Sequence, residues 1–260
     1  MRVIPLGVGG AFTDKFYHTN YIVEIPGFRL LIDAGTTLRY SLSAAGYTAK
    51  DIDAVAITHF HSDHVGGLEE FAQRCKFMYK HRPTVYAMPD QIPLLTSLFA
   101  LHGAKPEDYL KLSVSDSTII LKSSNDVQYQ LEYYSTVGLH AGVTSNYMIG
   151  IRWVARDKPR RIVFTGDIGT IEKSALGRLV GDSETAAVFH DCHTGAAPTF
   201  AHPTMEQIIN FYPAEQLKKI YCIHYGDNIA DCAEQIKAVG LKIAMQGESI
   251  DFYALFNRHV

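Results

Sequence analysis

Three histidines and an aspartate fall within six consecutive residues, His59-Phe60-His61-Ser62-Asp63-His64. This stretch directly follows an apolar run, 54–57, that we interpret as a buried strand. Imidazole nitrogens and carboxylate oxygens are ligands that zinc, manganese and iron accept in proteins. Without a metal ion, imidazoles packed this closely would repel one another below about their free pKa of 6.5. The stretch therefore predicts a metal site, and so many ligands in one loop favour a dinuclear one.

The composition excludes several other classes of protein. The chain has 260 residues, of which 47% are hydrophobic, enough for one large core. Its net charge is −3 and no basic stripe occurs, so we expect no extended nucleic-acid partner. No apolar run reaches the about 18 residues of a membrane span and no export signal is visible, so we expect a soluble cytoplasmic protein. Four scattered cysteines without a C-x-x-C pair are expected to be reduced.

Short strands alternate with short helices along the chain, which indicates an α/β fold. The predicted strands lie at 20–25, 29–33, 54–57, 85–87, 119–121, 129–134, 147–154, 161–164, 186–189 and 220–223. The predicted helices lie at 37–45, 67–75, 90–101, 171–179, 205–211 and 229–239. No Gly-, Ser- or Pro-rich linker divides the chain, so we expect one domain over 1–260.

Three further candidate ligands each follow a predicted strand. His140 comes after the strand at 129–134, Asp167 after 161–164 and His224 after 220–223. Side chains at the carboxyl ends of sheet strands converge on one rim, where α/β folds place their chemistry. We therefore expect these three residues to join the histidine-rich loop.

These motifs resemble those of metallo-β-lactamase-fold hydrolases, and among them the ribonuclease Z-like phosphodiesterases. The resemblance covers nearly the whole chain, from a Gly-rich turn at 6–11 through 31–35 and the motif at 58–67 to the later ligands. It implies an αββα sandwich of two mixed β-sheets flanked by helices. It also implies two divalent metal ions, zinc or alternatively manganese. The implied ligands are His59, His61 and His140 for one ion, Asp63, His64 and His224 for the other, Asp167 as the bridge, and Asp33 as a support for the ligand loop.

The resemblance also implies how such a site works. A hydroxide between the two ions attacks phosphorus, while Asp63 binds a metal and accepts a hydrogen bond from that hydroxide. Asp191 and His202 are similar to a ribonuclease Z pair, with His202 as the general acid. Alternatively, His202 simply stands at the entry to the helix at 205–211, with Thr204 as its cap. His193 departs from the family pattern and is a second candidate for the acid.

The spacing of the ligands bears on the substrate. Members that process transfer RNA insert a long arm between the third ligand and the bridging aspartate, whereas here the interval is 27 residues (167 minus 140), filled by one strand and a basic loop at 156–161. The chain is most similar to the compact cyclic-nucleotide phosphodiesterases, including the anti-Pycsar type. That resemblance implies hydrolysis of 3′,5′-cyclic nucleotides to nucleoside monophosphates. The expected substrates are cyclic pyrimidine nucleotides such as cCMP and cUMP, and cyclic purine nucleotides stay open.

Other activities stay open at this point. One is tRNA 3′ processing, and the other is thioester hydrolysis of the glyoxalase II kind. Glyoxalase II-like enzymes usually have a proline before the glycine at the third ligand, which Val137-Gly138-Leu139-His140 lacks. Candidate aromatic walls for a base are Phe12, Phe16, Tyr17 and Tyr109, each more often plain packing. The resemblance further implies a homodimer, for which the helix at 90–101 is a candidate interface, although core packing is the commoner role of such a helix.

Overall fold

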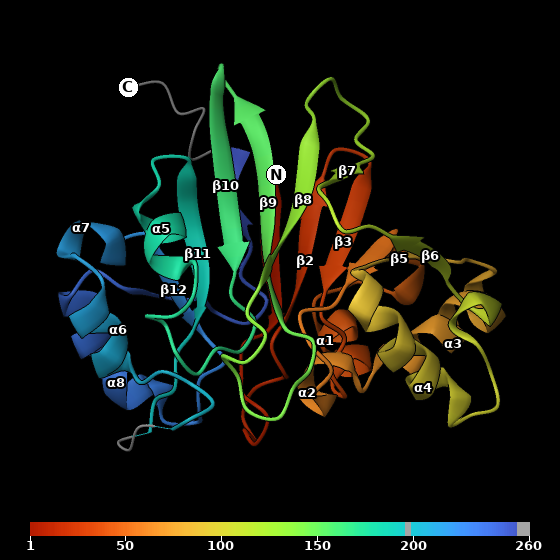
Figure 1. Ribbon diagram of the computed structural model, residues 1–260, viewed down its shortest axis with the longest axis horizontal. Helices are drawn as coiled ribbons and strands as arrows, with labels where there is room; N and C mark the ends of the chain where they lie inside the picture. The colour runs from red at the N-terminus through yellow and green to blue at the C-terminus, as the bar shows by residue number, and fades with distance from the viewer. Residues whose placement is uncertain (196–198, 254–260) are drawn as a thin grey trace.

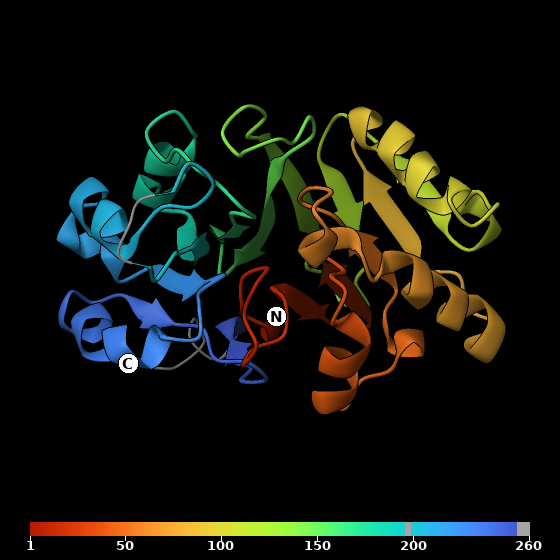
Figure 2. The ribbon, with the colours of Figure 1, turned by 90° about the horizontal axis from the view of Figure 1, so that it is seen from below.

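Two seven-stranded sheets lie face to face, with helices on both outer sides (Figure 1 and Figure 2). The computed structural model describes residues 1–195 and 199–253. The αββα sandwich expected from the sequence is therefore confirmed. None of the described helices is both long enough and apolar enough to span a bilayer.

The first sheet combines an antiparallel half with a parallel half. In spatial order it contains β14 (Ile250–Asp251), β1 (Arg2–Gly7), β2 (Asn20–Ile25), β3 (Phe28–Ile32), β4 (Ala54–Ala56), β5 (Thr84–Ala87) and β6 (Lys111–Val114). Strands β3 to β6 run parallel to one another. Its outer face carries α1 (Leu38–Ala44), α3 (Leu68–Tyr79) and α4 (Ile92–Ala100). The short α2 (Ser62–Val65) contains part of the histidine-rich loop.

The second sheet repeats this mixed arrangement. In spatial order it contains β13 (Lys242–Ile243), β12 (Ile220–Ile223), β11 (Thr185–Asp191), β10 (Lys158–Phe164), β9 (Tyr147–Ala155), β8 (Tyr129–Ser135) and β7 (Ile119–Leu121). Strands β10 to β13 are parallel. The helices on its outer side are α5 (Leu176–Gly181), α6 (Met205–Phe211), α7 (Ala214–Leu217) and α8 (Ile229–Ala238).

Aromatic side chains join the two sheets across the core. The ring of Tyr21, from β2, lies 4.8 Å from that of Phe164 in β10 and 5.4 Å from that of Phe189 in β11. The rings of Phe164 and Phe189 stack on each other at 5.0 Å. All three side chains are buried, and such pairs add about 0.5–1.5 kcal/mol beyond the burial of their area. This packing holds the ends of β10 and β11 opposite the first sheet.

Several predicted boundaries were wrong. The helix predicted at 171–179 begins only at Leu176, after a series of turns, and the helix predicted at 67–75 continues to Tyr79, where Lys80 adopts a left-handed φ of 54°. The basic loop predicted at 156–161 is a two-residue turn, Arg156 and Asp157, with φ of 49° and 60°. Two consecutive positive φ values suit the right-handed twist of a hairpin, so β9 and β10 continue up to this turn.

The apolar residues of helix α4 pack inside the protein. Leu95 and Phe99 are buried, and Ile92 and Leu98 pack against the same cluster. The helix is therefore a core element, as the commoner role of such a helix predicts. The homodimer stays a prediction.

Arg161 in β10 shows what the basic residues of this region do. Its Nε donates to Glu132 Oε2 at 2.9 Å, and its Nη1 donates to Asp182 Oδ2 at 2.9 Å. Glu184 lies 3.5 Å from Nη2 and also pairs with Arg152. Arg161 is thus a structural cation held between β8 and the entry to β11, and it is buried rather than offered to a polyanion.

Replacing Arg161 with methionine should lower the free energy of unfolding by about 1–3 kcal/mol, because it leaves the partly buried carboxylates of Glu132 and Asp182 without their cation. Urea denaturation of the two proteins measures the difference. The exposed Lys158, at the start of the same strand, gives the matched control, and K158M should change stability by less than about 0.5 kcal/mol. Equal losses in the two variants would contradict the structural role of Arg161.

Candidate metal centre

The candidate ligands come from strand ends that meet at one edge of the sandwich, the lower edge in Figure 1. The histidine-rich loop follows β4, and Asp33 follows β3. On the opposite sheet Asp167 follows β10 and His224 follows β12. His140 lies in the connection between β8 and β9. Both sheets therefore supply side chains to one place, although 165 residues (224 minus 59) separate His59 from His224.

The structure brings all seven residues together in two groups that share one carboxylate. The ligand atoms within each group all lie within 4.8 Å of one another. The first group is His59, His61, His140 and Asp167, and the second is Asp63, His64, Asp167 and His224. This is the grouping that the resemblance implied. The role of these residues as ligands remains a prediction.

Three of the histidines are anchored through Nδ1, so that Nε2 faces the two groups, where that of His140 lies 3.0 Å from His61 Nδ1. The Nδ1–H of His64 donates to Asp33 Oδ2 at 2.8 Å, and that of His140 donates to the carbonyl of Ala201 at 2.9 Å. His59 Nδ1 lies 3.1 Å from Thr58 Oγ1. A hydrogen bond at Nδ1 fixes both the ring orientation and the tautomer with an unprotonated Nε2, the form that binds a metal ion.

Whether these residues suit a cation can be judged from the buried polar atoms that lack a hydrogen-bond partner. Among the described residues, His59 Nε2, His64 Nε2 and Asp167 Oδ1 are buried and have no hydrogen-bond partner. Such an atom costs about 1–3 kcal/mol when nothing compensates it. All three are electron-pair donors, and they belong to the two groups. Their chemistry fits divalent metal ions. Two of them, His64 Nε2 and Asp167 Oδ1, lie 3.2 Å from each other, so a cation between the groups would be within reach of both.

One carboxylate supports both groups. Asp33, with a left-handed φ of 62°, accepts hydrogen bonds from the Thr58 backbone N at 2.7 Å and from its hydroxyl at 2.8 Å. Because the Thr58 hydroxyl donates to Asp33, it accepts from His59 Nδ1–H. Asp33 therefore orients His64 directly and His59 through Thr58, which gives a physical basis for its predicted supporting role.

Glycines let the ligand loop lie close to the strand end beside it. A Cβ on Gly35 would stand 1.9 Å from the Asp63 carbonyl oxygen, and one on Gly67 would stand 2.3 Å from the Gly35 carbonyl oxygen. Only glycine permits this approach. It allows the Ala34 backbone N to donate to the His64 carbonyl at 2.6 Å, so the loop is held by its backbone as well as by its side chains.

Charge in the two groups is shared between Asp167 and the imidazoles around it. Burial lowers the pKa of His64 and of His224, but Asp167 raises both by more, in His224 to about 10, so these two imidazoles are protonated beside the carboxylate. Burial raises the pKa of Asp167, but His224 and His64 lower it further, and the net pKa lies well below the ordinary value. Burial, and then the charge of His64, lower the pKa of His59. Ionised Asp167 and neutral His59 have the forms that coordinate metal ions, whereas His64 and His224 would each have to release a proton to do so.

His202 and Asp191 form a pair beside the second group. His202 Nδ1–H donates to Asp191 Oδ2 at 2.8 Å, and the His202 ring stacks on that of His224 at 4.6 Å. Burial lowers the pKa of His202, but Asp191 raises it more, so the net shift is upward. The alternative interpretation is also correct in part, because Thr204 caps α6 by accepting from the Gln207 backbone N at 3.2 Å. The two roles are compatible, since different residues perform them.

His193, the second candidate for the acid, lies nearby but is placed differently. Its ring centroid is 6.5 Å from that of His202. In the described hydrogen bonds and ion pairs, the Asp191 carboxylate contacts His202 and not His193. The geometry favours His202.

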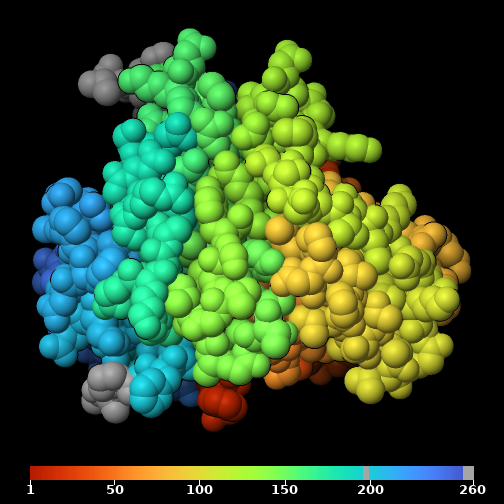
Figure 3. Space-filling view, in the orientation of Figure 1, coloured from red at the N-terminus to blue at the C-terminus, as the bar shows by residue number. Residues whose placement is uncertain are grey.

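A pocket of about 390 Å³ opens beside the pair. One wall is the segment 10–13 and the other includes His193 and His202, with His224 between them. Of the four aromatic candidates, only Phe12 lines it. Phe16 packs against Tyr225, and Tyr109 packs between Phe77 and Phe99 in the helical layer. In Figure 3 part of the N-terminal segment, in red, protrudes at the lower edge.

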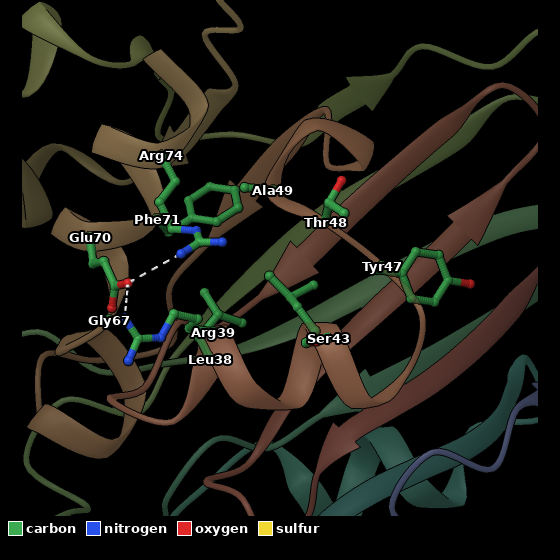
Figure 4. Close-up of a pocket in the computed structure, with 11 residues that line it drawn as sticks. Leu38, Arg39, Ser43, Tyr47, Thr48, Ala49, Gly67, Glu70, Phe71 and Arg74 are labelled. Atoms are coloured by element: carbon green, nitrogen blue, oxygen red, sulfur yellow. Dashed lines mark hydrogen bonds and ion pairs between the residues drawn. The ribbon is translucent and has the colours of Figure 1, made fainter. Parts of the chain in front are cut away.

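A second pocket lies between α1, α3 and the segment 47–49 (Figure 4). Its two arginines are already engaged, because Glu70 pairs with Arg39 at 3.0 Å and with Arg74 at 3.7 Å. It contains none of the candidate ligands, and its two arginines share the one carboxylate of Glu70. The pocket beside His202 is therefore the one that serves the centre.

Some residues at the centre carry no signal in the sequence. Asn146 donates from Nδ2 to the Asp167 carbonyl at 3.0 Å, and the Ala201 carbonyl positions His140. Thr58 relays between His59 and Asp33. Asn146 and Ala201 each act through a contact between segments that lie far apart in the sequence, which no local pattern predicts. The position of Thr58 directly before the histidine-rich loop is the one available hint.

Comparisons with known proteins agree with this geometry. Residues 1–249 match the family described as "Anti-Pycsar protein Apyc1". A relative of that description from Bacillus phage BSP38 is 31% identical over 263 residues, covering 95% of this chain and 97% of the relative. A diphosphatase from the PhnP family has a similar structure, with a TM-score of 0.74 at 20% identity over 96% of this chain and 97% of that one. The metallo-β-lactamase-fold protein YhfI from Bacillus subtilis gives 0.67 at 16% identity, covering 96% and 98%.

Replacing Asp33 with asparagine should weaken metal retention about 10- to 100-fold, because His64 and Thr58 lose their charged acceptor. Asparagine tolerates the left-handed φ at this position, so the backbone is preserved. Competition with a chromogenic chelator measures the affinity. D53N, at the exposed start of β4, is the matched control and should retain metal like the parent. Undiminished retention by D33N would show that the loop does not need this support.

Proposed function

The chain belongs to the anti-Pycsar protein Apyc1 family, and from that premise we propose that it is a metal-dependent phosphodiesterase acting on 3′,5′-cyclic nucleotides. The first candidate substrates are the cyclic pyrimidine nucleotides cCMP and cUMP, with the nucleoside monophosphate as product. The observation that carries the proposal is the pair of ligand groups sharing the buried Asp167. Such a pair suits in-line displacement at phosphorus, where charge develops on both the attacking and the leaving oxygen.

Seven residues would hold two divalent ions in the grouping described above, with Asp167 common to both. The set contains imidazoles and carboxylates and no thiolate, which suits Zn²⁺ and also Mn²⁺. When bound, the two ions would supply an activated water as the nucleophile and would neutralise charge on the phosphate oxygens.

Asp63 has a second task that its own geometry supports. Its Oδ2 lies 3.2 Å from His224 Nε2 and 3.3 Å from His64 Nε2, so this oxygen faces the second group. The carboxylate has a second oxygen, which can accept a hydrogen bond from the attacking water and so orient it. The side chain is 6% exposed, which keeps its orientation fixed.

His202 is placed to protonate the leaving group. Asp191 holds its Nδ1, which leaves Nε2 as the position that gives up a proton in the pocket. Asp191 is itself fixed, since its Oδ2 also accepts from the Ile168 backbone N at 3.1 Å. A departing ribose oxygen is a strong base, and a positioned acid contributes about 10²- to 10⁴-fold to the departure of such a group.

This pair separates the proposal from thioester hydrolysis. A thiolate leaves with a pKa of about 8.5 and needs no proton to depart near neutral pH. In a thioester hydrolase the Asp191–His202 pair would therefore have no evident task. A phosphodiester with an alkoxide leaving group gives it one.

The fold around the interval between His140 and Asp167 argues against a transfer-RNA substrate. Two strands, β9 and β10, and a two-residue turn fill most of this interval, so an arm for gripping RNA has no place there. Arg161, within the basic run, is paired with acidic residues inside the protein. A small phosphodiester fits the pocket better.

A substrate panel tests the proposal. The metal-loaded protein is incubated with cCMP, cUMP, cAMP, a precursor tRNA and a glutathione thioester, and products are separated by chromatography. Cleavage of the cyclic nucleotides is expected, and removal of metal by a chelator should abolish it until two equivalents of Zn²⁺ or Mn²⁺ are restored. Cleavage of the thioester alone, or of the tRNA alone, would refute the proposal.

His202→Ala should lower kcat for cCMP about 10²- to 10⁴-fold with metal content unchanged. The loss should be much smaller for a substrate with a p-nitrophenolate leaving group, because that group departs without a proton. Steady-state kinetics on both substrates, with metal analysis of the same samples, measures the difference. His193→Ala is the matched control and should retain most activity. A larger loss in H193A than in H202A would reverse the assignment of the acid.

A further inference from the structure

We infer that Phe12 is the residue on which the base of the substrate stacks, an inference that rests on the proposed function. Its side chain is 99% exposed, although a phenylalanine ring normally gains stability by burial. It is also one of the residues that line the pocket beside the metal centre. An unburied aromatic ring at the mouth of a pocket is a ready surface for the face of a planar ligand.

Phe12 belongs to a segment that lies directly against the centre. A Cβ on Gly10 would lie 3.2 Å from Cε1 of His224, so the backbone at Gly10 touches the ring of a candidate ligand. Phe12 follows two residues later, and two residues span at most about 7 Å. A phosphate held at the ligand groups would thus place its base, one ribose away, within reach of Phe12.

The segment that carries Phe12 is clamped rather than loose. The Asp227 carboxylate accepts from the Thr13 hydroxyl, from the Asp14 backbone N at 3.2 Å and from the Lys15 backbone N at 3.0 Å. The Gly10 backbone N donates to the Tyr225 carbonyl at 3.1 Å. Both ends of the segment are therefore tied to residues directly after His224, so the backbone that carries the ring is fixed before binding and only the side-chain rotamer remains to be ordered.

The rest of the pocket favours contact with the face of a base over contact with its edge. Among the described lining residues, hydrogen-bonding side chains are supplied by threonine, histidine, aspartate and a tyrosine. The hydroxyl of that tyrosine, Tyr225, already donates a hydrogen bond to the Ala244 carbonyl at 2.7 Å. These lining residues include none of the asparagine, glutamine, arginine or lysine side chains that read base edges in pairs of hydrogen bonds. The base would then be bound mainly by stacking on an aromatic ring, and this interaction is open to every base because each has a planar face.

Kinetics on two substrates test the inference. The first substrate is cCMP and the second is methyl p-nitrophenyl phosphate, which has no ribose and no base. In F12A the ratio of kcat/KM for cCMP to that for the second substrate should fall about 5- to 150-fold, the range expected for one base–aromatic stack. F12W should keep the ratio within about twofold of the parent. F77A, which removes another exposed phenylalanine on α3, should keep it as well. The same fall is expected with cAMP in place of cCMP.

Fluorescence gives a second measurement that needs no turnover. The chain has one native tryptophan, Trp153, which is buried, so F12W adds an exposed reporter. CMP, the product, should quench its emission, whereas ribose 5-phosphate should not. Equal responses to the two ligands would overturn the inference.

The kinetic outcomes separate this inference from the proposed function. An unchanged ratio in F12A, or equal losses on both substrates, overturns the role of Phe12 while cleavage of cCMP by the parent still supports the phosphodiesterase. A parent protein that leaves cCMP, cUMP and cAMP all intact refutes the proposed function, and the inference fails with it.

Discussion

The Asp167 carboxylate is the point on which the rest of the centre depends. A buried carboxylate is expensive unless opposite charge or a cation compensates it, and this one is 2% exposed. Its oxygens lie 3.2 Å from His64 Nε2 and 3.4 Å from His224 Nε2, and 3.7 Å from those of both His59 and His140. Imidazoles from both sheets are thus gathered around one negative charge. Every other feature, including the Asp33 support and the close approach at Gly35, serves to keep them there.

The sequence predicted those parts of the fold and site that depend on local patterns. Apolar runs located most strands, and α6 was predicted at its observed bounds, 205–211, because Thr204 is an ordinary cap. The seven clustered residues follow from their placement after strands together with a family resemblance. Their assembly was predictable because the carboxyl ends of parallel strands share an edge.

The features that the sequence did not predict depend on contacts across the fold. Strands β13 and β14 contain two residues each and are defined by their neighbours in the sheet. The hairpin tip at 156–161 proved shorter than expected, because β10 already begins at Lys158. Arg161 in that strand pairs with acidic residues in β8 and before β11, which the composition of the segment does not reveal. Likewise, four aromatic residues were equal candidates for a base wall until the packing of Phe16 and Tyr109 removed two of them.

The division of ligands between the two sheets has a consequence for folding. Residues 59–64 belong to the first sheet, whereas Asp167 and His224 belong to the second. An ion held by both sets would act as a staple across the sandwich, closing a loop of more than a hundred residues. Because the unfolded chain does not present these ligands together, such an ion binds the native state selectively, and its binding free energy adds directly to the stability of the fold. The ions that would take part in the chemistry would then also hold the two sheets together. Loss of these ions in a metal-poor environment would lower the stability of the fold as well as the activity.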